Sequence, residues 1–287
     1  MGCCLPKNTP LSIVMTELPQ MKTPCPELNT DKSCFFLDGR GYLWKMRQEN
    51  HPEEALEMYQ NNLSVHNIPD HPHILKPKTV LKINNTVVTC MEFGKDDLFN
   101  IIVKPFDAKM VMDGLFHLAG AIHFLHDNNI AHRDIKPENI VLFEKRLHLI
   151  DWDFCYPLNE RQHCGTPHFK CPESVSSLWN CSGRSFSRKS DVYSFGKTIF
   201  AILWRASMHN MISEKRFVFD AFHCSCLTSK ECPDGTGEWH NWIKIAILCI
   251  SNNPPECIPI ELATISAPNT GAKISEIEVV DADTAFA

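Results

Sequence analysis

No feature constrains the fold of this chain more than the run His-Arg-Asp-Ile-Lys-Pro-Glu-Asn at residues 132–139. It sets a carboxylate, an ammonium and an amide at fixed offsets on one segment. A second carboxylate, Asp151, follows twelve residues after Asn139. Phosphoryl transfer from a nucleotide needs such a set: an acid that orients the attacking hydroxyl, a cation beside the moving phosphoryl group, and oxygen ligands for Mg²⁺. An eight-residue run with this downstream partner is rarely a coincidence.

The run resembles the catalytic loop of protein kinases, and further segments resemble kinase motifs in the family's order. They are Met-Glu-Phe-Gly at 91–94, Ile-Asp-Trp-Asp at 150–153, Gly-Thr-Pro-His-Phe-Lys-Cys-Pro-Glu at 165–173 and Asp-Val-Tyr-Ser-Phe-Gly at 191–196. The resemblance covers about residues 33–262. It implies an α+β, two-lobed fold with a small, sheet-rich N-lobe and a larger, helical C-lobe. Lysine two residues after the catalytic Asp is typical of the serine/threonine class, and the compact size resembles reduced viral kinases.

Composition along the chain predicts three parts. Residues 1–30 are rich in Pro, Thr and Lys and are expected to form a flexible N-terminal arm. Residues 31–264 would form the kinase domain, with the N-lobe at about 31–93 and the C-lobe at about 94–264. Residues 265–287 are acidic and rich in small side chains, which predicts a disordered tail.

Local patterns predict several elements of the domain. Two short strands, 34–37 and 42–46, flank a turn and predict a hairpin. Asn50 followed by Pro52 and early acids predicts a helix that runs to about Leu63. Further predictions are a strand at 86–93, a helix at 107–128 and a short strand at 147–150.

Charge and cysteine usage limit the partners and the compartment. The formal net charge is −6 and there is no dense basic cluster, which argues against nucleic acid. No apolar run reaches the length of about 18 residues that a membrane span needs. No secretory signal is evident, so the 14 scattered cysteines are interpreted as reduced thiols in the cytoplasm.

Two short patterns have a structural and a functional interpretation. Gly2, Cys3 and Cys4 suit myristate and palmitate, and membrane contact is expected only if they are lipidated; Pro6 departs from the acylation pattern, which favours an unmodified arm. The segment 223–226, His-Cys-Ser-Cys, with Cys232 beyond, offers metal ligands, but zinc sites usually show two spaced pairs. A cysteine-rich loop is the preferred interpretation there.

The resemblance implies the chemical roles. Asp134 would accept the proton of the substrate hydroxyl, and Lys136 would lie against the transferred phosphate. Asn139 and Asp151 would coordinate Mg²⁺, and ATP would be the phosphoryl donor. Of the supporting residues, Asp191 would anchor the catalytic loop, and the others would shape the substrate-docking region: Arg133, Thr166 and Glu173.

The resemblance also implies the nucleotide site. Lys45 would grip the phosphates, paired with a glutamate of the following helix; Glu57 is the preferred partner and Glu54 the alternative. Met91 would be the gatekeeper at the hinge. The remaining expected contacts are the adenine-edge residues and a ribose-contacting acid, namely Glu92, Gly94 and Asp97.

The sequence departs from the family pattern at several points. No glycine-rich loop precedes the hairpin, because Gly2 is the only glycine before Asp38, so a phosphate cover of different composition is expected. Asp153 stands where the family has glycine and adds charge beside the metal. The late arginine that pairs with Glu173 is missing. No Ser or Thr lies between 153 and 165, and Glu160 is a candidate partner for Arg133.

Three functions fit these residues. The leading one is a serine/threonine protein kinase that moves the γ-phosphoryl of ATP to protein hydroxyls. A pseudokinase that serves as a binding or scaffolding module is the alternative, based on the missing glycine loop and on Asp153. A small-molecule kinase of the aminoglycoside or choline type would share the Ile-Asp-Trp-Asp motif but not the docking segment at 165–173.

Overall fold

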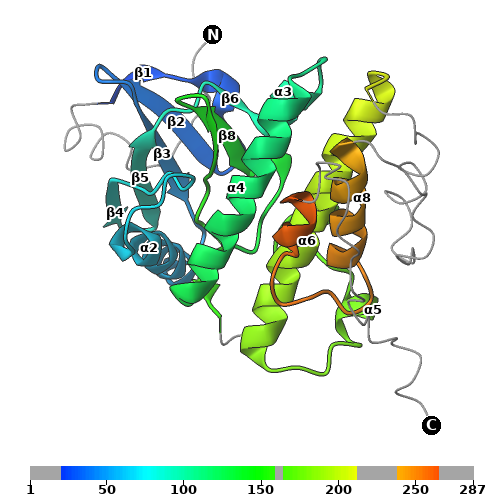
Figure 1. The fold of residues 1–287 in the computed structure, drawn as a ribbon. Helices are drawn as coiled ribbons and strands as arrows, with labels where there is room; N and C mark the ends of the chain where they lie inside the picture. Colours follow the sequence, from blue (N-terminus) through cyan, green and yellow to red (C-terminus); the bar gives the residue numbers. More distant parts are fainter. Residues whose placement is uncertain (1–20, 159–163, 212–237, 265–287) are drawn as a thin grey trace.

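A computed structural model of the chain describes residues 21–158, 164–211 and 238–264. Figure 1 shows a sheet-rich N-terminal part beside a helical C-terminal part, as expected for an α+β chain. The lipidation pattern at 2–4, Glu160, the segment 223–232 and the acidic tail 265–287 lie outside the described residues. No helix in the three described ranges is long and apolar enough to cross a membrane.

The N-terminal part is a five-stranded antiparallel sheet in the order β1-β2-β3-β5-β4. The strands are β1 (Met21–Pro24), β2 (Ser33–Asp38), β3 (Tyr42–Gln48), β4 (Thr79–Ile83) and β5 (Thr86–Glu92). The predicted hairpin is β2–β3, and its turn is closed by a hydrogen bond from the Gly41 N–H to the Asp38 carbonyl. Gly41 has φ of 85°, a conformation that favours glycine.

The start of the sheet corrects one expectation. Residues 21–30 were expected to belong to the N-terminal arm, but β1 pairs with β2 and a short helix, η1 (Pro26–Leu28), follows it. The Cys25 N–H also donates to the Phe35 carbonyl, which ties this segment to β2. These long-range backbone bonds cannot be read from the local composition.

Helix α2 (Pro52–Asn67) packs against β4 and β5. It begins at Pro52 as predicted, with His51 rather than Asn50 at the cap, and it continues four residues beyond Leu63. Its buried side chains include Asn61 and Asn62. Two adjacent buried amides on a helix need partners.

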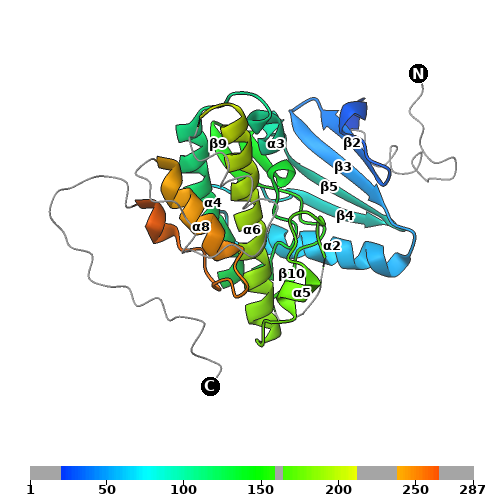
Figure 2. The ribbon, with the colours of Figure 1, turned by 90° about the vertical axis from the view of Figure 1, so that its right-hand side faces the viewer.

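The C-terminal part is mainly helical. It contains α3 (Leu98–Ile102), α4 (Ala108–Asp127), α5 (Glu173–Ser176), α6 (Gly183–Met208), α8 (Glu238–Cys249) and η4 (Ile260–Thr264). Figure 2 shows α4, α6 and α8 close together, and the main buried cluster draws on all three. The bounds of helix α4 agree closely with the predicted range, 107–128. The helix begins after Asp107, whose carboxylate caps it by accepting from the Met110 N–H at 3.1 Å.

Short strands hold the junction between the two parts. Strands β6 (Asp96–Asp97), β8 (Ile140–Phe143) and β9 (Arg146–Leu149) form one small sheet, and β7 (Ile130–Ala131) pairs with β10 (Tyr156–Pro157). The segment 132–139 connects β7 to β8 and ends in the turn η2 (Pro137–Asn139). The motif residues therefore lie where the sheet-rich and helical parts meet.

Candidate active site

The segment 132–139 is held by a buried carboxylate on α6. Asp191 is fully buried and accepts from the backbone N–H groups of His132 and Arg133, each at 2.8 Å, and from His126 Nε2 at 2.9 Å. Burial acts to raise the pKa of Asp191, but these donors outweigh it and lower the pKa. Arg133 has φ of 66°, which is unusual for a residue with a side chain. Asp191 thus lies where the sequence placed the anchor of the loop.

Asp134, Lys136 and Thr166 form one hydrogen-bonded group. Lys136 Nζ donates to Asp134 Oδ2 at 2.8 Å and to Thr166 Oγ1 at 2.6 Å. Thr166 donates to Asp134 Oδ1 through its hydroxyl at 2.7 Å and its N–H at 2.8 Å. Burial acts to raise the pKa of Asp134, but Lys136 and Thr166 outweigh it, so the pKa is lowered and the carboxylate is ionised near neutral pH.

Gly165 allows Thr166 to approach so closely. It has φ of 97°, and an added Cβ would collide with the Arg133 carbonyl. The guanidinium of Arg133 itself lies 4.9 Å from the ring centroid of Tyr156, within cation–π range. Glu173 is exposed and, within the described ranges, pairs with no basic side chain.

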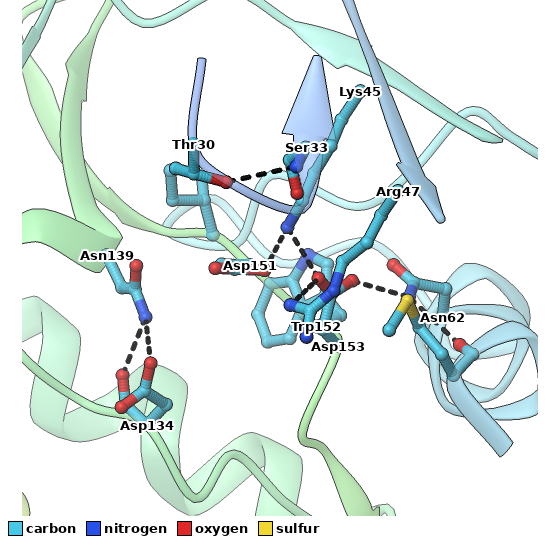
Figure 3. A network of polar contacts seen from close by, with 12 residues as sticks. Thr30, Ser33, Lys45, Arg47, Asn62, Asp134, Asn139, Asp151, Trp152 and Asp153 are labelled. Atoms are coloured by element: carbon cyan, nitrogen blue, oxygen red, sulfur yellow. Dashed lines mark hydrogen bonds and ion pairs between the residues drawn. The ribbon is translucent and has the colours of Figure 1, made fainter. Parts of the chain in front are cut away.

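Asn139 and Asp151 have the chemistry of a Mg²⁺ site. Asn139 Nδ2 donates to the Asp134 carbonyl at 2.8 Å and to Asp134 Oδ2 at 3.0 Å. Figure 3 shows the amide oxygen on the side away from Asp134. Mg²⁺ in nucleotide sites takes one or two protein oxygens together with phosphates, so an amide oxygen and a carboxylate fit it. No cluster of three His, Cys, Asp or Glu side chains in the described part suits a metal.

A cavity of about 260 Å³ brings most predicted nucleotide residues together. Its walls come from the sheet, from the segment after β5 and from the β8–β9 region. The predicted residues that line it are Lys45, Met91, Glu92, Gly94, Asp97, Asn139 and Asp151. The sequence had not singled out its apolar lining, which includes Leu28, Phe35, Leu43, Val141 and Ile150.

Two of these residues have a local structural role as well. A Cβ on Gly94 would collide with the side chain of Val141, so glycine keeps the segment after β5 against the cavity floor. Asp97 caps α3 by accepting from the Asn100 N–H at 2.7 Å, and its other oxygen accepts from Asn100 Nδ2 at 2.9 Å. The ribose contact expected of Asp97 stays a prediction.

The expected pair between Lys45 and Glu57 is not formed. Lys45 Nζ instead donates to Asp151 Oδ1 at 2.7 Å and to Asp153 Oδ2 at 2.6 Å (Figure 3). Glu57 and the alternative, Glu54, are exposed on α2, and neither forms an ion pair among the described residues. Burial acts to lower the pKa of Lys45, but the two carboxylates outweigh it and raise the pKa, so the ammonium is retained.

The segment after β9 carries a buried aromatic residue and a buried acid. Trp152 is fully buried, and its Nε1–H donates to the Leu75 carbonyl at 2.9 Å. Asp153 is 6% exposed and contacts Lys45 and Arg47, so its charge is directed to cations of β3. The sequence did not predict this placement because the partners lie more than a hundred positions apart.

A short connection without glycine joins β1 to β2. It contains η1 and a turn in which the Ser33 N–H donates to Thr30 Oγ1 at 3.1 Å. Figure 3 shows this contact between Thr30 and Ser33, and Leu28 of η1 lines the cavity of about 260 Å³. The expectation that this connection covers the phosphates stays a prediction.

A histidine cluster was missed by sequence reasoning. His73 stacks on His117 at 4.6 Å and on His148 at 5.7 Å between ring centroids, and His71 lies 6.1 Å from His73. A hollow of about 720 Å³ beside this cluster is larger than the nucleotide cavity but contains none of the motif residues. We assign the chemistry to the smaller cavity because the acid, amide and lysine meet there.

Comparison with known proteins agrees with this geometry. The protein kinase domain family matches residues 39–256, well over half of the chain. The chain is 31% identical to "Putative serine/threonine-protein kinase R436" of Acanthamoeba polyphaga mimivirus. The alignment covers 52% of this chain and 58% of that protein. The SNF1-related protein kinase catalytic subunit alpha KIN12 of Arabidopsis thaliana is 29% identical over 46% of this chain and 27% of its own length.

The serine/threonine-protein kinase DCLK1 of Rattus norvegicus is 28% identical over 57% of this chain and 39% of its own length. The chain thus spans less than two thirds of the length of these relatives. The matched region contains the hinge, the catalytic loop, the Ile-Asp-Trp-Asp segment and the docking segment. The chain belongs to the protein kinase family.

Proposed function

We propose that the protein is a serine/threonine protein kinase that transfers the γ-phosphoryl group of ATP to protein hydroxyls. The observation that carries this proposal is the meeting of two groups at one cavity. Lys45, Asn139 and Asp151 line it, and the Asp134–Lys136–Thr166 group adjoins it through the hydrogen bonds of Asn139 to Asp134. Together they supply the parts that phosphoryl transfer requires.

ATP would enter the cavity with its adenine at the hinge. Met91 is buried at the end of β5, and the backbone around Glu92 and Gly94 would bond the adenine edge. The apolar lining favours an aromatic base. Lys45, kept charged by its two carboxylates, would hold the phosphates, and Asp97 would contact the ribose.

Catalysis would rest mainly on positioning and charge. The Asp134 carboxylate is ionised and fixed by Lys136 and Thr166, so it would orient the acceptor hydroxyl and take its proton. Lys136 would stabilise charge on the transferred group. Mg²⁺, held by Asn139 and Asp151, would supply further charge neutralisation when bound.

Protein rather than small-molecule substrates are favoured by the docking segment. Residues 165–173 follow the order of the family's peptide-docking loop, and Thr166 in that segment contacts Asp134 directly. We propose Ser/Thr-containing proteins as substrates and residues 31–264 as the kinase domain. Residues 21–30, which contribute β1 and η1, should be kept with that domain when it is produced alone.

The pseudokinase alternative is not favoured. Inactive relatives generally lose at least one of the groups that bind nucleotide or metal, whereas Lys45, Asp134, Lys136, Asn139 and Asp151 are all present and face one site. Asp153, which had supported that alternative, contacts Lys45 instead of opposing the metal.

The test is transfer of labelled γ-phosphate from ATP with Mg²⁺ to mixed protein substrates. We expect incorporation by the parent and a loss of about 10²–10⁴-fold for Asp134→Asn, because positioned acid–base groups contribute rates of that order. Circular dichroism and AMP-PNP binding of Asp134→Asn serve as controls for folding. Absence of transfer by a folded parent that binds ATP would overturn the proposal in favour of a pseudokinase, and transfer only to small alcohols or amines would overturn the substrate class.

A further inference from the structure

Lys45 has two carboxylate partners that differ in what else they do. Asp151 lines the nucleotide cavity and its side chain is 26% exposed, whereas the side chain of Asp153 is 4% exposed and lies outside the residues that line that cavity. One oxygen of each carboxylate, Oδ1 of Asp151 and Oδ2 of Asp153, accepts a hydrogen bond from Lys45 Nζ. On the proposed function, Asp151 is also a ligand of Mg²⁺. An ammonium and a dication compete for one carboxylate, so Asp151 is poorly suited to hold the lysine during turnover.

Asp153 is held from both sides. Arg47 Nη1 donates to its Oδ2 at 3.0 Å, and Asn62 Nδ2 donates to its Oδ1 at 3.1 Å. Asn61 Nδ2 donates to its backbone carbonyl at 2.9 Å. The carboxylate therefore joins β3 to α2, and both of its oxygens are engaged (Figure 3).

The charges balance around this group. Three positive charges meet three negative charges here. The cations are Lys32, Lys45 and Arg47, and the carboxylates are Glu49, Asp151 and Asp153. Buried ions need partners of the opposite sign. If Asp151 turned to a metal, Asp153 would still neutralise Lys45. Glu54 and Glu57 of α2 line a hollow of about 230 Å³ beside Asp153, but neither forms an ion pair among the described residues. The contacts from α2 to Asp153 come instead from Asn61 and Asn62, which are neutral donors.

We propose that Asp153 is the positioning residue for Lys45 in this kinase, in the place of a glutamate from α2, and that Asn62 fastens α2 to it. This inference rests on the proposed function. Among the described residues, Asp151 and Asp153 are the acids that form ion pairs with Lys45, and Asp151 would be occupied by the metal. The lysine–helix link is then indirect: ammonium to Asp153, and Asp153 to the amide of Asn62.

A double-mutant cycle on nucleotide binding tests the proposal. The affinity of the full-length protein for AMP-PNP with Mg²⁺ is measured by calorimetry for the parent, Asp153→Asn, Lys45→Met and the double variant. We expect Asp153→Asn to weaken binding by about tenfold or more, since truncating one member of a buried charge pair has effects of at least that order. We expect the double variant to bind like Lys45→Met, within about twofold, because Asp153 acts through the lysine.

Two further variants complete the test. Asn62→Ala leaves every charge in place. If Asp153→Asn does not fold, Asn62→Ala replaces it in the cycle. We then expect Asn62→Ala to weaken AMP-PNP binding in the parent but not in the Lys45→Met background. Glu57→Gln is expected to bind AMP-PNP as the parent does. Unchanged affinity of Asp153→Asn, losses that multiply in the double variant, or a loss in Glu57→Gln equal to that in Asp153→Asn would each overturn the proposal.

Binding rather than transfer is measured so that the two proposals can fail separately. A parent that binds AMP-PNP but transfers no phosphate would overturn the proposed kinase activity, and the cycle would still decide the role of Asp153. A folded parent that binds no nucleotide would overturn both.

Discussion

The catalytic loop and the neighbourhood of Lys45 are built in different ways. In the loop, Asp134 contacts Lys136 and Asn139 at offsets of two and five residues, so the motif itself nearly fixes the geometry. Around Lys45, the two carboxylate partners lie 106 and 108 positions away. The chain keeps the family's local pattern where spacing determines contact. Where contact depends on packing, as at Lys45, the ion pair forms with Asp153 and not with a glutamate of α2.

The largest effect is expected from the anchor of the loop. Asp191→Asn removes the negative charge that accepts from two backbone N–H groups and His126, and hydrogen bonds to charged groups contribute about 1.5–3 kcal/mol each. We expect the free energy of unfolding to fall by about 3 kcal/mol and phosphate transfer to fall with it. Urea denaturation and the transfer assay measure the two effects.

Asp113→Asn, on the exposed surface of α4, is the matched control, and it should retain the parent's stability. If Asp191→Asn matched that control, the loop geometry would not depend on its anchor. The catalytic loop would then not differ from the Lys45 neighbourhood in the way that its position is fixed.

A smaller effect is expected at Trp152, where the two regions meet. Trp152→Phe keeps an aromatic ring in the position but removes the donor to the buried Leu75 carbonyl, which lies 77 positions away. An unsatisfied buried polar group costs about 1–3 kcal/mol. We expect the free energy of unfolding to fall by that amount in urea denaturation. An unchanged value would mean that Trp152 contributes to stability only through its buried apolar ring.

The sequence predicts the catalytic loop better than the neighbourhood of Lys45. Asp134, Lys136, Asn139, Asp151 and Asp191 were identified from spacing and motif order, and the structure brings them together. The predicted pair between Lys45 and Glu57 is wrong because the face that a helix presents to the sheet depends on its packing, which the local sequence does not determine. Strand β1 escaped detection because its hydrogen bonds to β2 join residues in a proline-rich segment without alternation.

The smallest effect is expected from the histidine cluster, which lies away from both regions. Burial is the main cause that lowers the pKa values of His71, His73 and His148. Unfolded histidines take up protons near pH 6.5, whereas these folded histidines do so at lower pH. Between pH 7.5 and 5 the unfolded state therefore binds more protons, and the free energy of unfolding decreases as the pH falls.

Thermal denaturation at pH 7.5 and 5.5 measures this dependence. His73→Gln should reduce the decrease in the melting temperature on acidification, whereas His168→Gln, an exposed histidine outside the cluster, should leave it as in the parent. The carboxylates with lowered pKa values titrate below this window, so they add little to it. Equal slopes for all three proteins would exclude a contribution from the cluster.

The division of work between the two carboxylates is tested most directly by a crystal structure with AMP-PNP and Mg²⁺. We expect the nucleotide to lie in the cavity lined by Met91 and Lys45, the metal to lie on Asn139 and Asp151, and Lys45 to remain bonded to Asp153. A structure in which Glu57 has turned inward to pair with Lys45, or in which the metal lies on Asp153, would contradict it.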